Sequence, residues 1–373
     1  MRVTINCRSF SLKEYAGIGR YAYNLVKSLS AIDQETEYYL YLKKDFFDFR
    51  RHIPTFPAKN FKVKVDQFHL GPKRLVNRTD IYHLPSPDWI DESGGKIIVT
   101  VHDLIHRFFP AGHSNETIEI VEKQFQGVIQ KAHKIICCSE STLEDLKKSY
   151  GVGHEKACRI YQGVDKSLFC PLKEGEDTRS QHILKSHGVE LPFLLFVGTI
   201  EPRKNVPALL EAFAILKNKS RFWGKLVIIG KKGWQSEGVF SLIPKLHLRN
   251  DVFFLGFVPD EELRYFYALA EAFVYPSSYE GFGFPILEAM SCGCPVVTTA
   301  ISSCGEIAKD AAVFADPLMA QSIAEGIKKM IESKEFKEDL RRKALLRSQD
   351  FSFQKTAQET LKIYKEVYRS GAS

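Results

Sequence analysis

The stretch Ala272-Phe-Val-Tyr-Pro-Ser-Ser-Tyr-Glu-Gly-Phe-Gly-Phe-Pro-Ile-Leu-Glu-Ala-Met-Ser-Cys292 predicts a strand, a glycine-rich turn and a helix in direct succession. Its first four residues are apolar and suit a buried strand. Pro285 is a residue type favoured in the first turn of a helix. Between the two elements, Gly281 and Gly283 allow a backbone path that brings amide groups close to a ligand. The segment therefore predicts an α/β unit with an anion site at a helix N-terminus.

Two carboxylates, Glu280 and Glu288, flank this turn. A ligand with hydroxyl groups on both sides of its phosphates fits that arrangement, and a nucleotide sugar has this shape. Glu288 lies near the helix start, where the helix dipole stabilises an acid, so a purely capping role stays open. Because Pro285 has no backbone N–H, amide contacts to phosphate in this turn must come from neighbours such as Phe284 or Ile286.

Short apolar strands alternate with helical stretches through both halves of the chain. The expected strands are 3–7, 38–42, 97–101, 134–138, 193–197, 225–229, 252–255, 272–275 and 295–298, and the expected helices include 19–29, 141–150, 206–217 and 285–292. This alternation predicts parallel sheets covered by helices on both faces. In such sheets, ligands bind in the crevice outside the carboxyl ends of the strands.

We predict an α/β protein with two doubly wound domains of similar size. The first spans residues 1–172 and the second 191–354, and the polar stretch within 173–190 is the expected linker. A final helix at about 355–370 has apolar residues at helical spacing and is expected to pack back on the first domain.

The composition is that of a soluble globular protein larger than one ordinary domain, with 373 residues, 44% hydrophobic and 26% charged. No apolar run approaches the roughly 20 residues of a membrane span. Met1 leads directly into a strand pattern, so we expect no secretory signal and a cytoplasmic protein. Cys292 and Cys294 form a CxC pair without a second pair at zinc-finger spacing, so we expect no metal site.

The net charge of +7 is spread unevenly. Residues 50–78 hold eight Lys or Arg and one acid, Asp66. This stretch is either a solvated surface or a patch for an anionic membrane or a phosphate-bearing acceptor. No recognised nucleic-acid motif accompanies the charge, so we expect no nucleic-acid partner.

Two pairs of polar residues follow expected strands at their carboxyl ends. Arg203 and Lys204 would neutralise a diphosphate without a metal, arginine by a forked contact and lysine as a point charge. Exposed loop cations are the alternative, and Glu201 competes for them. His102 and Asp103 suit substrate hydroxyls or proton transfer, although a structural histidine is equally compatible with the pattern.

The run Gly17-Ile-Gly-Arg-Tyr-Ala22 matches the GxGxxA dinucleotide pattern in poor context, because it lies several residues after the first strand. A flexible loop that approaches a sugar or phosphate, through Gly17 and Gly19, fits better. Further along, backbone groups at Val258 follow a strand and could meet the edge of a base.

Together these motifs resemble a family of retaining glycosyltransferases with the GT-B fold, family 4. The resemblance runs through nearly the whole chain and is carried by 17–20, 102–103, 138–141, 163–165, 201–205, 256–260 and the E-x7-E signature at 280–288. It implies two Rossmann-like domains that face each other across a cleft.

The resemblance also implies roles for individual residues. Glu280, His102, Arg203 and Lys204 are the implied catalytic residues: Glu280 and His102 at the donor sugar, Arg203 and Lys204 at the leaving diphosphate. The implied donor-binding residues are Gly17, Gly19, Ser139, Val258, Gly281, Phe282, Gly283, Phe284, Ile286 and Glu288, with Glu288 on the ribose and Val258 at the base. One departure from the family pattern is Thr199, where many relatives have an arginine.

The implied reaction moves a hexose, from GDP-mannose or a UDP-hexose, to a glycan or lipid-linked saccharide in surface polysaccharide assembly. It proceeds with retention and needs neither a metal nor a cofactor, the nucleotide sugar being a substrate. The alternatives are a sugar-nucleotide 2-epimerase of the same architecture and an inactive sugar-nucleotide-binding subunit. The basic stretch 50–78 adds a possible peripheral contact with the inner face of an anionic membrane.

Overall fold

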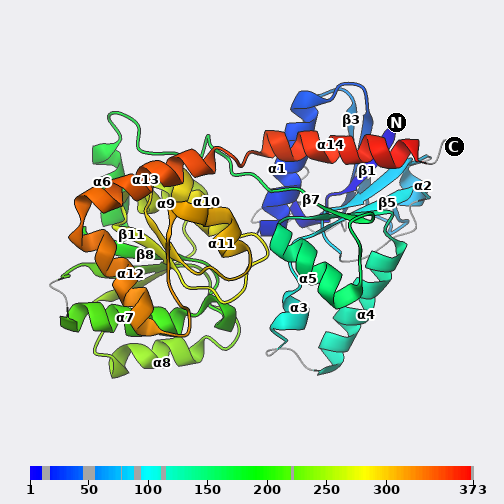
Figure 1. Cartoon of the computed structure of the whole chain (residues 1–373). Helices are drawn as coiled ribbons and strands as arrows, with labels where there is room; N and C mark the ends of the chain where they lie inside the picture. Colours follow the sequence, from blue (N-terminus) through cyan, green and yellow to red (C-terminus); the bar gives the residue numbers. More distant parts are fainter. Residues whose placement is uncertain are drawn as a thin grey trace. The chain divides into compact units, whose positions relative to one another are not determined.

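The computed structural model describes residues 1–10, 17–44, 55–76, 78–87, 94–110, 115–219 and 222–370. The chain divides into two compact units, each built on one parallel sheet with helices around it (Figure 1). The first unit comprises Met1–Gly163 and Phe351–Ser373, and the second comprises Val164–Asp350. The predicted α/β class with two doubly wound domains is confirmed.

The first unit contains a seven-stranded sheet in the order β3-β2-β1-β4-β5-β6-β7, and the strands pair in parallel. Its strands are β1 Arg2–Asn6, β2 Glu37–Lys43, β3 Phe61–Asp66, β4 Ile81–Leu84, β5 Lys96–Val101, β6 Lys134–Cys137 and β7 Ala157–Arg159. Its helices are the 3-10 turn η1 Arg8–Phe10, α1 Gly17–Ile32, α2 Pro72–Leu75, α3 Ile105–Phe108, α4 Asn115–Lys131, α5 Glu140–Tyr150 and α14 Phe353–Arg369.

The core of the first unit forms where the central strands meet their covering helices. Val99 and Val101 of β5 are fully buried in one cluster with Phe125 and Ile129 of α4. On the other side, α14 crosses α1 and packs against it, as Figure 1 shows. A buried hydrogen bond of 2.6 Å joins the Tyr364 hydroxyl of α14 to Nδ1 of His83 on β4, so the end of the chain is fastened to the first sheet.

The second unit contains a six-stranded parallel sheet in the order β10-β9-β8-β11-β12-β13. Its strands are β8 Phe193–Val197, β9 Lys225–Ile229, β10 Val252–Gly256, β11 Ala272–Tyr275, β12 Val296–Thr298 and β13 Val313–Phe314. Its helices are α6 Asp177–Ser186, η2 Pro202–Lys204, α7 Val206–Lys219, α8 Glu237–Lys245, α9 Asp260–Leu269, α10 Phe284–Ser291, α11 Ser302–Ala308, η3 Lys309–Ala311, α12 Ala320–Glu332 and α13 Lys334–Ser348.

The order of strands reverses at one point in each sheet. In the second unit this switch lies between β8 and β11, which pair directly although many residues separate them in sequence. Both strands are apolar throughout and buried along their whole length. The loops that leave the carboxyl ends of β8 and β11 therefore lie beside each other, which is the usual place for a ligand in a doubly wound sheet.

The boundary between the units differs from the expected linker. The chain passes from the first unit to the second between Gly163 and Val164, and it returns between Asp350 and Phe351. Residues 173–190 lie inside the second unit, where they contribute helix α6, which packs on α9. Their polar side chains lie on the exposed face of that helix, and this explains why the stretch looked like a linker in the sequence.

Candidate active site

Three of the predicted catalytic residues meet at the switch point of the second sheet. Arg203 and Lys204 lie in the 3-10 turn η2, which follows β8. Glu280 lies in the loop that follows β11. Two backbone hydrogen bonds from helix α11 hold this glutamate in place: its N–H donates to the Ser302 hydroxyl at 2.9 Å, and its carbonyl accepts from Ser303 at 2.8 Å.

The carboxylate of Glu280 is ion-paired to both cations. Its Oε1 lies 2.6 Å from Nζ of Lys204, and its Oε2 lies 2.8 Å from a terminal nitrogen of Arg203. The hydroxyl groups of Tyr275 and Ser277 donate to the same Oε1 at 3.0 and 2.7 Å. The Tyr275 hydroxyl also accepts a hydrogen bond from the Lys204 ammonium.

This cluster is buried and its charges are balanced. Arg203 makes a second ion pair with Glu201 at 2.6 Å, so two guanidinium or ammonium groups face two carboxylates. Burial raises the pKa of Glu280, but Lys204 and Arg203 outweigh it and bring that pKa to about 2. Burial lowers the pKa of Lys204, and Glu280 offsets only part of this effect. The cluster therefore carries no net positive charge, and its cations could attract an anionic ligand only after one of the two carboxylates moves away.

One donor in the cluster has an unmet hydrogen bond. Nε of Arg203 is buried and has no hydrogen-bond partner among the described residues. Buried donors are nearly always paired in folded proteins. An acceptor from outside the chain, such as a phosphate oxygen, would satisfy this one.

The glycine turn leads into α10 next to this cluster. Gly283 precedes the helix with φ of 96°, a left-handed conformation that side chains rarely adopt, and a Cβ at this position would lie 3.4 Å from the Ile286 side chain. The rings of Phe282 and Phe284 pack edge to face, with centroids 5.2 Å apart. The turn thus holds the predicted residues 281–284 in a fixed path beside Glu280.

Glu288 lies further along α10 and is buried. Its Oε2 accepts a hydrogen bond from the Tyr267 hydroxyl at 3.1 Å. Val258 follows β10 and is also buried, after Gly256 with φ of 68°. The side chain of Val258 is therefore a packing group, and only its backbone could serve the predicted contact with a base.

His102 belongs to the first unit, where both of its ring nitrogens are hydrogen-bonded. Nε2 lies 2.7 Å from the Pro85 carbonyl and must donate to it. Nδ1 then accepts from the Gln162 amide at 2.7 Å. These two bonds fix the tautomer and the orientation of the imidazole ring.

The remaining predicted residues of the first unit begin helices. The Ser139 side chain is fully buried and accepts a hydrogen bond from the Thr142 amide at 3.0 Å, so it caps α5. That cap explains why a serine stands there, and it leaves none of the side chain on the surface. Gly17 and Gly19 form the first turn of α1.

Several partners of these residues were not predicted from the sequence. Tyr275 and Ser277 complete the shell around Glu280, and Gln162 holds His102. Tyr275 ends an apolar strand, which gave no sign that its hydroxyl is used. Gln162 directly precedes the glycine of the 163–165 motif, and this position next to a motif is the only feature of the sequence that could have indicated a role for it.

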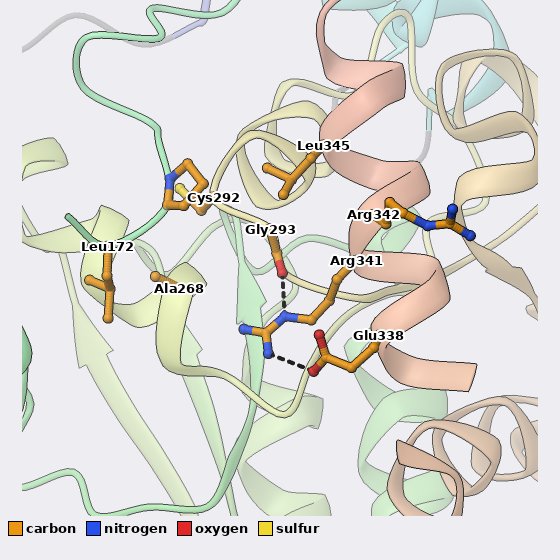
Figure 2. A pocket seen from close by; sticks show the side chains of 9 residues that line it. Leu172, Ala268, Cys292, Gly293, Glu338, Arg341, Arg342 and Leu345 are labelled. Carbon is orange, nitrogen blue, oxygen red and sulfur yellow. Dashed lines mark hydrogen bonds and ion pairs between the residues drawn. The ribbon is translucent and has the colours of Figure 1, made fainter. Parts of the chain in front are cut away.

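A pocket of about 400 Å³ in the second unit contains none of the predicted residues (Figure 2). It lies beside α13 and the end of α10, with Leu172, Ala268 and Leu345 among its apolar lining. Arg341 donates to the Gly293 carbonyl at 2.9 Å and pairs with Glu338 at 3.2 Å, so its charge is already compensated.

In the part of the chain that the structure describes, no group of three or more His, Cys, Asp and Glu side chains is placed to hold a metal ion. The helices of this part include none that is both long and apolar enough to cross a membrane.

Comparison with known proteins gives matches to both units. The family model for glycosyl transferases group 1 matches residues 180–347, and the model for glycosyltransferase family 4 matches residues 15–168. The O-antigen chain mannosyltransferase B of Escherichia coli is 30% identical over 382 residues, a region that covers 94% of this chain and 96% of that protein.

Solved structures agree with this result at the level of the fold. A sucrose-phosphate synthase from Thermosynechococcus elongatus superposes with a TM-score of 0.78 at 18% identity over 99% of both chains. The Anabaena protein HepE in complex with UDP-glucose superposes with a TM-score of 0.75 at 20% identity, over 98% of this chain and 100% of that one. The two doubly wound units therefore form a GT-B fold.

Proposed function

Because the chain belongs to the group 1 glycosyltransferases, we propose that it transfers a hexose from a nucleotide sugar to a glycan or lipid-linked saccharide. Mannose from GDP-mannose is the favoured hexose, since the mannosyltransferase from Escherichia coli matches over nearly its whole length. A UDP-hexose is the second candidate. Assembly of a surface polysaccharide is the proposed setting, and peripheral contact with the inner membrane face through 50–78 belongs to the same proposal.

One observation carries this proposal: a buried arginine, lysine and glutamate cluster beside the N-terminal turn of α10, at the switch point of a parallel sheet. The donor diphosphate would take the place of the Glu280 carboxylate on Arg203 and Lys204. The unpartnered Nε of Arg203 would gain a phosphate oxygen as acceptor. Glu280 would then turn toward the hydroxyl groups of the hexose.

The reaction we propose proceeds with retention and without a metal ion. Negative charge develops on the diphosphate as the bond to the sugar C1 breaks. Arg203, Lys204 and the amides at the start of α10 would stabilise that charge, and preorganised donors of this kind supply much of the rate enhancement in many enzymes. The acceptor hydroxyl would attack the same face of the sugar and pass its proton to the leaving phosphate.

The other predicted contacts remain part of the proposal. Glu288 would accept hydrogen bonds from the ribose hydroxyl groups, which would replace the bond that it now accepts from the Tyr267 hydroxyl. Backbone atoms of Val258 would contact the base. The imidazole of His102, held by Gln162, would approach the transferred sugar.

The test is nucleotide release from GDP-mannose, UDP-glucose and related donors in EDTA, with and without acceptor, together with thermal shift. We expect one donor to stabilise the protein and to be consumed without added metal. Lys204→Met should abolish both effects, while Lys245→Met, a change at an exposed lysine of the same unit, should leave them intact. Stabilisation by no nucleotide sugar would refute the donor site, and strict dependence on magnesium or manganese would refute the leaving-group argument.

A further inference from the structure

The hydroxyl group of Tyr275 makes two hydrogen bonds in the cluster around Glu280, and each bond has only one possible direction. A lysine ammonium has donors and no acceptor, so Lys204 must donate to the phenol oxygen. The phenol proton is then directed to Oε1 of Glu280, at 3.0 Å. This carboxylate oxygen also lies 2.6 Å from Nζ of Lys204, so the ammonium and the phenol meet at one acceptor.

The ring of Tyr275 is held firmly at the end of strand β11. It is fully buried and stacks on Phe196 of β8 and on Phe273 of β11, with centroids 5.7 and 5.5 Å apart. Its backbone carbonyl accepts a hydrogen bond from the Thr298 hydroxyl at 2.8 Å. The Lys204 ammonium lies 4.9 Å from the ring centroid, which is within the range of a cation–π interaction. The hydroxyl group is therefore fixed in position and cannot turn to a different part of the unit.

Departure of the Glu280 carboxylate would leave the Tyr275 proton without an acceptor. Among the described residues, Lys204 and Glu280 are the only hydrogen-bond partners of this hydroxyl, and Lys204 cannot accept. Burial, as the largest cause, raises the pKa of Tyr275 well above its usual value, so the phenol keeps its proton. A buried donor without a partner is costly and rare. The hydroxyl group therefore needs another acceptor at the place that Oε1 occupies.

The second hydroxyl group at Oε1 has other acceptors within reach. Ser277 lies 2.7 Å from Oε1, but its Oγ also lies 3.1 Å from the Arg203 carbonyl and 3.2 Å from the Tyr279 carbonyl. Its proton can rotate to either carbonyl when Glu280 moves. Of the two hydroxyl groups, that of Tyr275 thus depends on a replacement for the carboxylate.

We propose that the Tyr275 hydroxyl belongs to the diphosphate site and donates to the phosphate oxygen that replaces Oε1 of Glu280. This role rests on the proposed function, in which the donor diphosphate displaces that carboxylate from Arg203 and Lys204. The phosphate oxygen then meets the donors that Oε1 meets now, the ammonium and the phenol. When the bond to the sugar C1 breaks, its electron pair stays on the diphosphate, and both donors face the growing negative charge. Tyr275 is in this way a further catalytic residue at the leaving group.

The test is calorimetric titration of GDP and UDP into four proteins: the parent chain, Tyr275→Phe, Glu280→Gln and the double variant. The Glu280→Gln background separates a direct contact with the diphosphate from an effect that acts through the carboxylate. In that background, Tyr275→Phe should weaken nucleotide binding between about tenfold and a hundredfold, as expected for one hydrogen bond to a charged group. In the parent background the loss should be smaller, because the substitution also loosens the competing carboxylate.

Transfer of the sugar gives a second measurement. With the nucleotide sugar that the parent chain consumes, kcat of Tyr275→Phe should fall about tenfold or more, because the hydrogen bond strengthens as charge develops on the diphosphate. The phenylalanine ring retains the stacking on Phe196 and Phe273, so the fold should survive. Thermal unfolding of each variant would verify this.

Tyr265→Phe is the matched control in the same unit. Tyr265 is also buried, and its hydroxyl donates at 3.3 Å to the carboxylate of Glu176, which is paired with Arg264. The substitution therefore removes a tyrosine hydroxyl from an ion pair that contains none of the predicted site residues. It should leave nucleotide affinity and kcat unchanged in both backgrounds.

The possible failures are distinguishable. Equal nucleotide affinity of Glu280→Gln and the double variant would overturn the role of Tyr275, and the donor site itself would stand because the parent chain still binds. Equal losses in Tyr265→Phe and Tyr275→Phe would overturn that role as well. A parent chain that binds neither GDP nor UDP would refute the proposed function and, with it, the contact from Tyr275.

Discussion

Replacing Glu280 by glutamine tests whether this carboxylate and the donor diphosphate compete for the same two cations. The amide keeps the shape of the side chain and removes its charge. Lys204 would keep the hydroxyl of Tyr275 as a partner, and Arg203 would keep Glu201. The fold should survive, with one positive charge left uncompensated in a buried cluster.

The two expected effects have opposite signs. Breaking a buried pair by removal of one partner lowers the free energy of unfolding by about 3–5 kcal/mol, and the partners that remain favour the lower end. A loss of about 3 kcal/mol would lower the Tm of a unit of this size by about 6–12 °C. A phosphate oxygen bound to the same two cations would lie about 5 Å from the carboxylate, and at an effective dielectric constant of 20 their repulsion is about 3 kcal/mol. Removing this repulsion should tighten the binding of a nucleoside diphosphate by up to about a hundredfold.

Calorimetric titration with GDP and UDP, beside thermal unfolding of the same samples, would measure both quantities. We expect Glu280→Gln to melt earlier, to bind the nucleotide more tightly and to transfer sugar more slowly. Glu325→Gln, at an exposed acid of α12 in the same unit, is the matched control and should change none of these. Weaker nucleotide binding in Glu280→Gln would refute the competition, and an unchanged Tm would refute the stabilising role of the cluster.

Two further predictions concern histidines of the first unit. Burial, with a smaller contribution from His102, lowers the pKa of His83 to about 3, so the unfolded chain binds a proton that the folded chain does not, and stability falls as pH drops below about 6.5. Between pH 6.5 and 5, His83→Gln should lose about 2 kcal/mol less unfolding free energy than the parent protein, so its urea midpoint should depend less steeply on pH. An identical pH dependence in the two proteins would show that His83 is not the cause. Gln162→Leu should lower kcat about tenfold with little change in KM, because the His102 ring loses its orientation. Restoration of kcat by Gln162→Asn would support a role of Gln162 in positioning His102. An unaffected pH–rate profile would exclude that role.

The fold was predicted well where strands are buried on both faces. The bounds of β8, β9 and β11 match the apolar runs that predicted them, because a central parallel strand is apolar along its whole length. Strand β3 escaped prediction because it is an edge strand in which lysines alternate with apolar residues. Strand β4 escaped because it is short and contains a histidine, and only the folded chain supplies the partners that allow His83 to be buried.

The candidate site was predicted as a set of residues but not as a set of contacts. Carboxyl ends of strands brought Arg203, Lys204 and Glu280 together, as parallel topology requires. The sequence could not show that Glu280 would be paired with the cations. That pairing depends on the hydrogen bond from the Tyr275 hydroxyl and on the bond between the Glu280 backbone and helix α11. Long-range side-chain geometry of this kind leaves no local pattern.

These contacts also bear on which group could take the proton of the acceptor hydroxyl. Of the four predicted catalytic residues, Arg203 and Lys204 are donors. In the structure Glu280 has both carboxylate oxygens on cations and a pKa of about 2. In the proposed donor complex the diphosphate would replace it on those cations, and its carboxylate would be occupied by the hydroxyl groups of the hexose. His102 uses Nε2 as a donor to a carbonyl and Nδ1 as an acceptor from Gln162, so it would have to break a bond before it could accept a proton. In the reaction we propose, the leaving diphosphate would gain basicity as its bond to the sugar lengthens, and Arg203 and Lys204 would hold it in place of Glu280. We therefore propose the phosphate as the proton acceptor, which would favour attack and departure on one face of the sugar over catalysis by a separate base.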